Sequence, residues 1–335
     1  MIKIGIAGYG KIGKLRANIL SERKDVKIVG IYDVAKPERI ENITFYNSYE
    51  DLLNAELDAV FICAYNTVLA DYTARALNKG VHVFCEKPPA MKTEELGIVF
   101  EALKSSKKKL KYGFNHRYHY SVMEAKKIID SGEMGKLLWM RGVYGKAGSI
   151  DYNTNWRNYK KHSGGGILID QGIHMLDLMR YFSKENFNKI SSHITTAYWD
   201  IKVEDNAFII MESENNIIAS MHSSATQWKH KFLLEMCFEE GYINLDGILS
   251  GTRSYAPEKL VVGRREFEDI TFAMGKPKEN TTWFENDDSW KLEVDEFIDA
   301  ILGKRKIEHG TSKDAFETLK LVERIYENSG FYKDE

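Results

Sequence analysis

The sequence contains few cysteines and no excess of either charge, and both shortages exclude classes of protein. Cys63, Cys85 and Cys237 are the only cysteines, and their spacing matches no metal or redox motif. We therefore expect reduced, structural thiols, no metal site and a cytoplasmic protein. The 47 lysines and arginines are balanced by 49 aspartates and glutamates, which argues against a nucleic-acid-binding protein.

Long apolar runs are missing as well. No run approaches the roughly 20 residues that cross a bilayer, so we expect no membrane span. The first residues, MIKIGIAG, lack a basic region followed by a long apolar one, and are therefore expected to form a strand rather than a signal peptide. A hydrophobic content of 43% with a net charge of only -2 excludes a wholly disordered chain, and 335 residues predict about two domains.

The first third of the chain alternates between strand-like and helix-like patterns. The expected strands are 2–7, 26–32, 59–64, 81–85 and 110–112, and the expected helices are 11–23, 70–78 and 96–104. Continuous apolar strands that alternate with helices are typical of a parallel sheet buried on both faces. We therefore predict an α/β protein whose residues 1–116 form a doubly wound, dinucleotide-binding Rossmann domain.

The pattern changes after residue 116. Helices are expected at 122–131, 167–182, 290–302 and 312–328, a long loop at 145–166, and short strands at 190–199, 207–214, 217–224, 232–239, 242–245 and 259–262. These elements predict an α+β domain over 117–335 with a large, mainly antiparallel open sheet, whose last helix can pack back on the first domain. Apolar residues point to both faces of the sheet in places such as 217–221, so we expect a homodimer or homotetramer formed through it.

A glycine-rich turn joins the first strand to the first helix. It reads Gly8-Tyr9-Gly10-Lys11-Ile12-Gly13, and Asp33 ends the second strand 20 residues after Gly13. In this context G-x-G-x-x-G lets a pyrophosphate approach the helix N-terminus, while the acidic residue binds a ribose 2′-hydroxyl. A carboxylate repels a 2′-phosphate, so we predict NAD rather than NADP, although the nearby Lys36 could soften this preference. A glycine-rich turn without a ligand is the alternative.

Two further motifs carry titratable groups. Glu86-Lys87-Pro88-Pro89 directly follows the strand at 81–85, and ligands of open α/β sheets bind beyond the carboxyl ends of the strands. Lys87 is therefore expected near the ligand, with an ordinary charged loop as the alternative.

The helix expected at 167–182 has a narrow polar stripe. At about 100° per residue, Asp170, His174 and Asp177 fall within about 60° of one another on an otherwise apolar helix. Asp170 and His174 are neighbours at i and i+4, and a histidine there can exchange a proton near neutral pH. We interpret the stripe as the lining of a cleft; a buried structural His–Asp pair and a metal site are the alternatives.

These motifs, together with Asn115-His116-Arg117-Tyr118, resemble the Gfo/Idh/MocA oxidoreductases in the same order along essentially the whole chain. The resemblance implies that the N-terminal domain binds a nicotinamide cofactor and that a sugar or polyol binds against the antiparallel sheet. It also implies that Lys87 contacts the reacting hydroxyl, that His174 accepts its proton and that Asp170 orients the substrate. A lysine base in place of the histidine is the competing mechanism.

The resemblance further implies two sets of binding residues. The cofactor set comprises Gly8, Tyr9, Gly10, Lys11, Ile12, Gly13, Asp33, Asn66, Glu86, Lys87, Asn115, Trp156 and Arg157. The substrate set comprises Lys87, Arg117, Tyr118, Tyr144, Asp170 and His174. One stretch departs from the family pattern, because residues 64–69 keep only Asn66 of the usual Thr-Pro-Asn-x-x-His.

We predict an NAD-dependent dehydrogenase that takes hydride from a secondary hydroxyl of a sugar phosphate or nucleotide sugar, at C3. Family members with a glycine-rich loop and an Asp-Asn pair like Asp205-Asn206 often act on such sugars. The loop at 145–166 offers aromatic, amide and basic side chains, which suit an anionic sugar. The alternatives are a solvated loop, an inositol or polyol dehydrogenase, an NAD-dependent glycosidase that works by transient oxidation, and a non-catalytic dinucleotide sensor.

Overall fold

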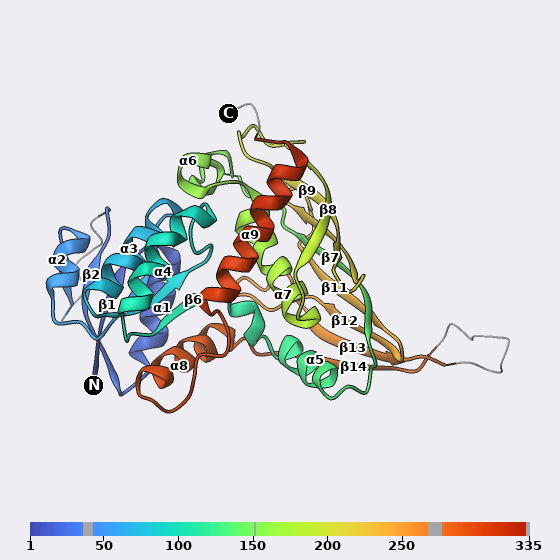
Figure 1. Ribbon diagram of the computed structural model, residues 1–335, viewed down its shortest axis with the longest axis horizontal. Helices are drawn as coiled ribbons and strands as arrows, with labels where there is room; N and C mark the ends of the chain where they lie inside the picture. Colours follow the sequence, from blue (N-terminus) through green and yellow to red (C-terminus); the bar gives the residue numbers. More distant parts are fainter. Residues whose placement is uncertain (36–42, 151, 267–276, 333–335) are drawn as a thin grey trace. The chain divides into compact units, whose positions relative to one another are not determined.

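The computed structural model describes residues 1–35, 43–150, 152–266 and 277–332, which form two compact units (Figure 1). Unit 1 comprises Met1–Asn115, Lys161–Gly164 and Trp290–Lys320, and unit 2 comprises His116–Lys160, Gly165–Ser289 and Leu321–Glu335. Two segments that the sequence had placed in the second domain, 161–164 and 290–320, thus belong to unit 1. Lys36 lies outside the described residues.

Unit 1 contains the predicted parallel sheet, with the strand order β3-β2-β1-β4-β5-β6. The strands are β1 (Ile2–Ala7), β2 (Val26–Tyr32), β3 (Thr44–Tyr46), β4 (Ala59–Ile62), β5 (His82–Glu86) and β6 (Leu110–Gly113). Its helices include α1 (Lys11–Ser21), α2 (Tyr49–Asn54), α3 (Asn66–Asn78), α4 (Leu96–Ser105), the short α6 (Lys160–Ser163) and α8 (Ser289–Ile301). The strand order reverses at β1, which pairs with both β2 and β4, and this is where such sheets bind their ligands.

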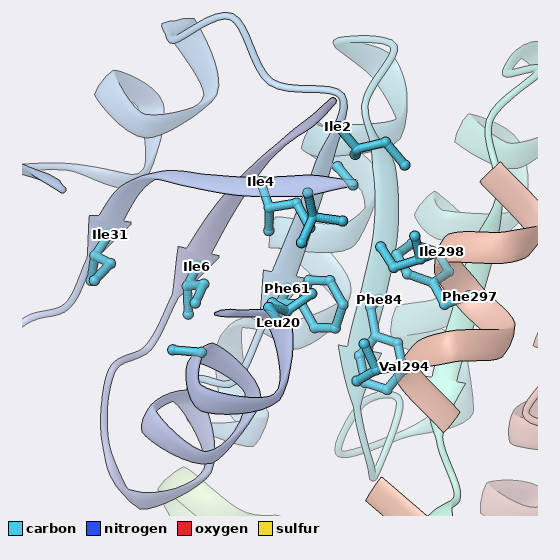
Figure 2. Close-up of a cluster of buried hydrophobic side chains, with 13 residues drawn as sticks. Ile2, Ile4, Ile6, Leu20, Ile31, Phe61, Phe84, Val294, Phe297 and Ile298 are labelled. Carbon is cyan, nitrogen blue, oxygen red and sulfur yellow. The ribbon is translucent and has the colours of Figure 1, made fainter. Parts of the chain in front are cut away.

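One buried apolar cluster joins α1 and α8 to the same face of this sheet. Figure 2 shows Ile4 and Phe61 on the strands, with Phe297 of α8 among the same buried side chains. The ring of Phe297 meets Phe61 and Phe84 edge-on, with centroids 5.6 Å apart in both pairs. Each such fully buried side chain contributes roughly 1.5–3 kcal/mol of hydrophobic stabilisation. A helix from late in the sequence is thereby part of the dinucleotide-binding unit.

Unit 2 contains the predicted large sheet, with the order β14-β13-β12-β11-β7-β10-β9-β8. The strands are β7 (Leu137–Gly145), β8 (Phe187–Thr195), β9 (Asn206–Ser213), β10 (Ile218–Ser224), β11 (Lys231–Phe238), β12 (Gly241–Asp246), β13 (Glu258–Arg264) and β14 (Glu279–Phe284). All neighbouring strands are antiparallel except β7 and β10. The α/β fold class and the mainly antiparallel second sheet are therefore confirmed.

The helices of unit 2 pack on this sheet. They include α5 (Tyr120–Asp130) and α7 (Ile173–Ser183), with α7 against β7 and α5 against β12 and β13 (Figure 1). The last helix, α9 (Ser312–Ser329), begins in unit 1 and ends in unit 2. Among the described residues, no helix combines the length and the apolar character that crossing a bilayer requires.

Candidate active site

The glycine-rich turn between β1 and α1 is closed on its protein side and open at Gly10. A Cβ at Gly8, whose φ is +92°, would lie 2.4 Å from the Cys63 carbonyl oxygen, and one at Gly13 would lie 2.0 Å from the Gly8 oxygen. A Cβ at Gly10, the N-cap of α1, would meet nothing within 4 Å. The helix N-terminus therefore has space for an anion beside its backbone N–H groups.

Asp33 lies beside this turn, as its spacing predicted. Its carboxylate accepts hydrogen bonds from the backbone N–H of Tyr9 and, at 2.8 Å, from the N–H of Ala35. A carboxylate fixed next to the anion-binding turn is the acceptor that an adenosine ribose needs. The open Gly10 and the held Asp33 thus fit a dinucleotide.

Two candidate cofactor residues that follow or end β4 and β5 form side-chain hydrogen bonds within unit 1. Glu86, assigned above to the cofactor, is buried and accepts a 2.8 Å hydrogen bond from Nε of Arg16. Asn66 donates from Nδ2 to the Ser163 carbonyl oxygen at 2.8 Å. Lys87 follows Glu86 at the carboxyl end of β5, and its peptide bond to Pro88 is cis. Sequence reasoning missed Arg16, because an arginine on α1 carries no motif.

In unit 2, Asp170 lies between two cations. It belongs to a π-helical turn, Leu168–Gly172, that precedes α7, and its carboxylate binds Nζ of Lys146 at 2.9 Å and Nε of Arg157 at 3.2 Å. Arg157 was predicted to lie at the cofactor; here it is ion-paired to the predicted substrate aspartate. Lys146, which directly follows β7, was missed because the sequence did not show that β7 exists.

His174 is the second residue of α7 and is almost completely buried. Its ring stacks on that of His116, with centroids 3.8 Å apart and an interplanar angle of 16°. Nε2 of His116 lies 2.9 Å from the hydroxyl of Tyr144, a predicted substrate residue on β7. Burial raises the pKa of Tyr144 well above its usual value, so its phenol stays protonated at neutral pH. The sequence contained His116 in a quoted motif but gave it no role.

Aromatic rings connect Tyr144 to the Lys146 side of the site. Its ring meets that of Tyr255 edge-on, with centroids 5.4 Å apart, and the Tyr255 ring meets the imidazole of His230 at 4.8 Å. Burial, followed by the charge of Lys146, lowers the pKa of His230. Imidazole, phenol, ammonium and guanidinium groups therefore share one region of unit 2 with the carboxylate of Asp170.

Two other predicted substrate residues, Arg117 and Tyr118, are buried. Arg117 binds Asp177 through two hydrogen bonds, of 2.7 and 2.6 Å, and both side chains are buried. Asp177 therefore does not share the role of Asp170 and His174, although all three were expected on one stripe. Removing either partner of such a buried pair costs about 3–5 kcal/mol. Tyr118 and the cofactor candidate Asn115 are buried as well.

The Asp205-Asn206 pair was one reason to predict a sugar-phosphate substrate from the sequence. In the structure it forms buried hydrogen bonds within unit 2. The carboxylate of Asp205 is fully buried and accepts hydrogen bonds from the backbone N–H groups of Ala197, Tyr198 and Trp199 at 2.8, 2.8 and 3.0 Å. Asn206 donates from Nδ2 to Asp205 at 3.0 Å. This pair fixes the loop before β9 and gives no support for an anionic substrate.

Known proteins share both units. Residues 2–114 match the oxidoreductase family with an NAD-binding Rossmann fold, and residues 122–244 match the GFO/IDH/MocA C-terminal domain. Glucose-6-phosphate 3-dehydrogenase of Bacillus subtilis is 29% identical over 240 residues, covering 67% of this chain and 68% of that protein. Inositol 2-dehydrogenase of Salmonella paratyphi B is 28% identical over 292 residues, covering 80% and 82%. The structure of levoglucosan dehydrogenase with NADH and levoglucosan has the same fold, with a TM-score of 0.83 at 20% identity over 98% of this chain and 97% of that one.

A Rossmann unit with an intact dinucleotide fingerprint and a second unit with a large, mainly antiparallel sheet define a nicotinamide-dependent dehydrogenase. The chain belongs to the Gfo/Idh/MocA family, which confirms the resemblance of its motifs.

Proposed function

We propose that this dehydrogenase oxidises a secondary ring hydroxyl, at C3, of a sugar phosphate or nucleotide sugar, with NAD as its cofactor. The observation that carries the proposal is the surplus of positive charge around Asp170. Among the described residues, Lys146 and Arg157 both contact this one carboxylate, so two cationic groups face a single negative charge there, and such a region favours an anionic substituent. The similarity to a glucose-6-phosphate 3-dehydrogenase supports the same substrate class and the same carbon.

We assign the chemistry to Lys87 and His174. Bound NAD would supply the hydride acceptor, held by the turn at Gly10 and by Asp33. His174 removes the hydroxyl proton, because a buried imidazole is a suitable general base near neutral pH. Lys87 donates a hydrogen bond to the same oxygen and stabilises its developing negative charge. Asp170 accepts a hydrogen bond from a neighbouring hydroxyl, while Lys146 and Arg157 bind the anionic group.

NAD is proposed over NADP because Asp33 presents a negative charge beside the glycine turn. We also propose that the outer face of the large sheet pairs with a second copy of the chain. Trp139, Phe208, Ile210 and Ile218 leave 41–58% of their surface exposed on neighbouring strands. A cytoplasmic location stays a prediction.

A substrate panel tests the proposal. Glucose 6-phosphate, a UDP-linked hexose, glucose and myo-inositol are each incubated with NAD, and NADH formation is followed by absorbance. We expect an anionic sugar to have the highest kcat/KM. Better turnover of inositol would instead support a polyol dehydrogenase, for which the long match to inositol 2-dehydrogenase argues. Product release without net NADH would identify a glycosidase that recycles its cofactor.

The variant Lys146→Met tests directly whether Lys146 binds the anionic group of the substrate. Losing a hydrogen bond between charged groups costs about 1.5–3 kcal/mol, so KM for the anionic substrate should rise roughly 10- to 100-fold. Turnover of glucose should change little. Lys136→Met is the matched control, because Lys136 is exposed and directly precedes the other end of β7. Equal effects on anionic and neutral sugars would contradict the role assigned to Lys146.

A further inference from the structure

Arg16 is completely buried between two carboxylates and two aromatic rings of unit 1. Its Nε donates to Oε1 of Glu86 at 2.8 Å, and its Nη2 donates to Oε2 of Glu293 at 2.6 Å. The guanidinium carbon lies 4.4 Å from the centroid of the Phe84 ring and 4.5 Å from that of Trp290. The two hydrogen-bonded carboxylates and the two aromatic rings therefore hold the guanidinium group in a single position.

The carboxylate of Glu86 is enclosed on its other side by β6. Gly113 is the cross-strand partner of Glu86, and a Cβ there would lie 2.8 Å from Oε2 of Glu86 and 3.3 Å from Nη2 of Arg16. Any larger residue at position 113 would therefore push the ion pair apart. Glu86 is the last residue of β5, and its backbone continues directly into Lys87.

The buried cluster connects three segments of unit 1, namely β5 with Glu86, α1 and α8. Arg16 lies on α1, whose N-terminus carries the glycine turn, and Glu293 lies on α8. Burial raises the pKa of Glu293 to about 7 against the opposing charges of Arg16 and Lys111. Near neutral pH this carboxyl is therefore only partly ionised.

We infer that Arg16 and Glu86 are positioning residues for Lys87: their ion pair fixes the backbone from which Lys87 extends, relative to the helix that carries the glycine turn. This inference rests on the proposed function, in which Lys87 polarises the reacting hydroxyl. It replaces the role of cofactor contact that the resemblance implied for Glu86. A reacting group displaced by about 1 Å can lose on the order of 100-fold in rate, so the pair is expected to act on kcat.

Glu86→Ala and Glu86→Gln separate positioning from cofactor binding. We expect Glu86→Ala to lower kcat with NAD and glucose 6-phosphate at least tenfold and to leave the Kd of NADH, from fluorescence titration, within twofold. Glu86→Gln still accepts a hydrogen bond from Arg16 and should restore most of kcat. Glu296→Gln is the control, because Glu296 on α8 is also buried and pairs with Lys111 at 2.8 Å, but it is not adjacent to Lys87 in the chain.

Amide hydrogen exchange gives a readout that needs no substrate. The peptide covering residues 85–90 should exchange at least tenfold faster in Glu86→Ala than in the wild type or in Glu296→Gln. Arg16→Lys, which cannot bridge both carboxylates, should act in the same direction and serves if Glu86→Ala fails to fold. Unchanged exchange at 85–90, or a tenfold weaker Kd for NADH, would overturn the inference. An unchanged kcat in Lys87→Ala would instead refute the proposed function.

Discussion

Gly10→Ala should separate cofactor binding from stability. The φ of Gly10 is −72°, a value that alanine adopts without strain, and the added Cβ meets no protein atom within 4 Å. Loss of unfolded-state entropy stabilises such a variant by about 0.4–1 kcal/mol, and the poorer N-cap preference of alanine offsets a similar amount. The free energy of unfolding should therefore change by less than about 1 kcal/mol.

The same methyl group occupies the space through which a pyrophosphate would approach the N-terminus of α1. Losing one hydrogen bond to that charged group costs about 1.5–3 kcal/mol, which is a roughly 10- to 100-fold increase in the Kd of NADH. The assay is fluorescence titration with NADH, together with urea unfolding of the same preparations.

Two other glycine-to-alanine variants serve as controls for this prediction. Gly97→Ala on α4 also places its Cβ in open space, so it should change neither the Kd nor the fold. Gly8→Ala forces a Cβ against the Cys63 backbone at a positive φ and should destabilise the unit strongly. A wild-type Kd in folded Gly10→Ala would refute the placement of the pyrophosphate at this turn.

Three further outcomes are expected. Asp33→Ala should narrow the preference for NADH over NADPH, mainly by weakening NADH; equal Kd values for the two cofactors in the wild-type protein would contradict the role of Asp33. The pKa of Glu293 is raised to about 7 by burial, so the folded state binds more protons than the unfolded state between about pH 4.5 and 7, and stability falls as pH rises through that window. Glu293→Gln should flatten this slope in urea unfolding, and an unchanged slope would locate the effect elsewhere. Ile210→Lys combined with Ile218→Lys should yield a monomer by light scattering; a monomeric wild-type protein would remove the basis for this interface.

The sequence predicted the fold well, because its signals are local. Continuous apolar strands and the glycine turn with Asp33 established the Rossmann unit without any tertiary information. β7 was missed, since Arg141 and Gly142 interrupt its apolar pattern. The structure shows why a glycine is there: a Cβ at Gly142 would lie 2.8 Å from Cε of Met179 and 2.9 Å from Sδ of Met175, both on α7.

The candidate site was less predictable, because its partners are distant in sequence. An ideal α-helix placed Asp177 beside Asp170 and His174, but a π-helical turn at Leu168–Gly172 changes that geometry, and Asp177 pairs with Arg117. Lys146 lies 24 residues before the aspartate that it binds. Such ion pairs depend on tertiary structure, so no local sequence pattern predicts them.

The stacking of His174 on His116 points to a matched comparison at the proposed base. His116→Phe keeps an aromatic face against His174 and removes the second imidazole together with its hydrogen bond to Tyr144, so it is the control for His174→Ala. We expect the control to retain most of kcat.

The most direct test of the account is kcat for His174→Ala, measured by NADH formation from the best substrate of the panel. Removing a general base lowers turnover by roughly 10²- to 10⁴-fold. The Kd of NADH should stay within twofold, because His174 is not an anchor of the dinucleotide. Wild-type kcat with an unchanged pH profile would contradict the account and transfer the role of base to Lys87.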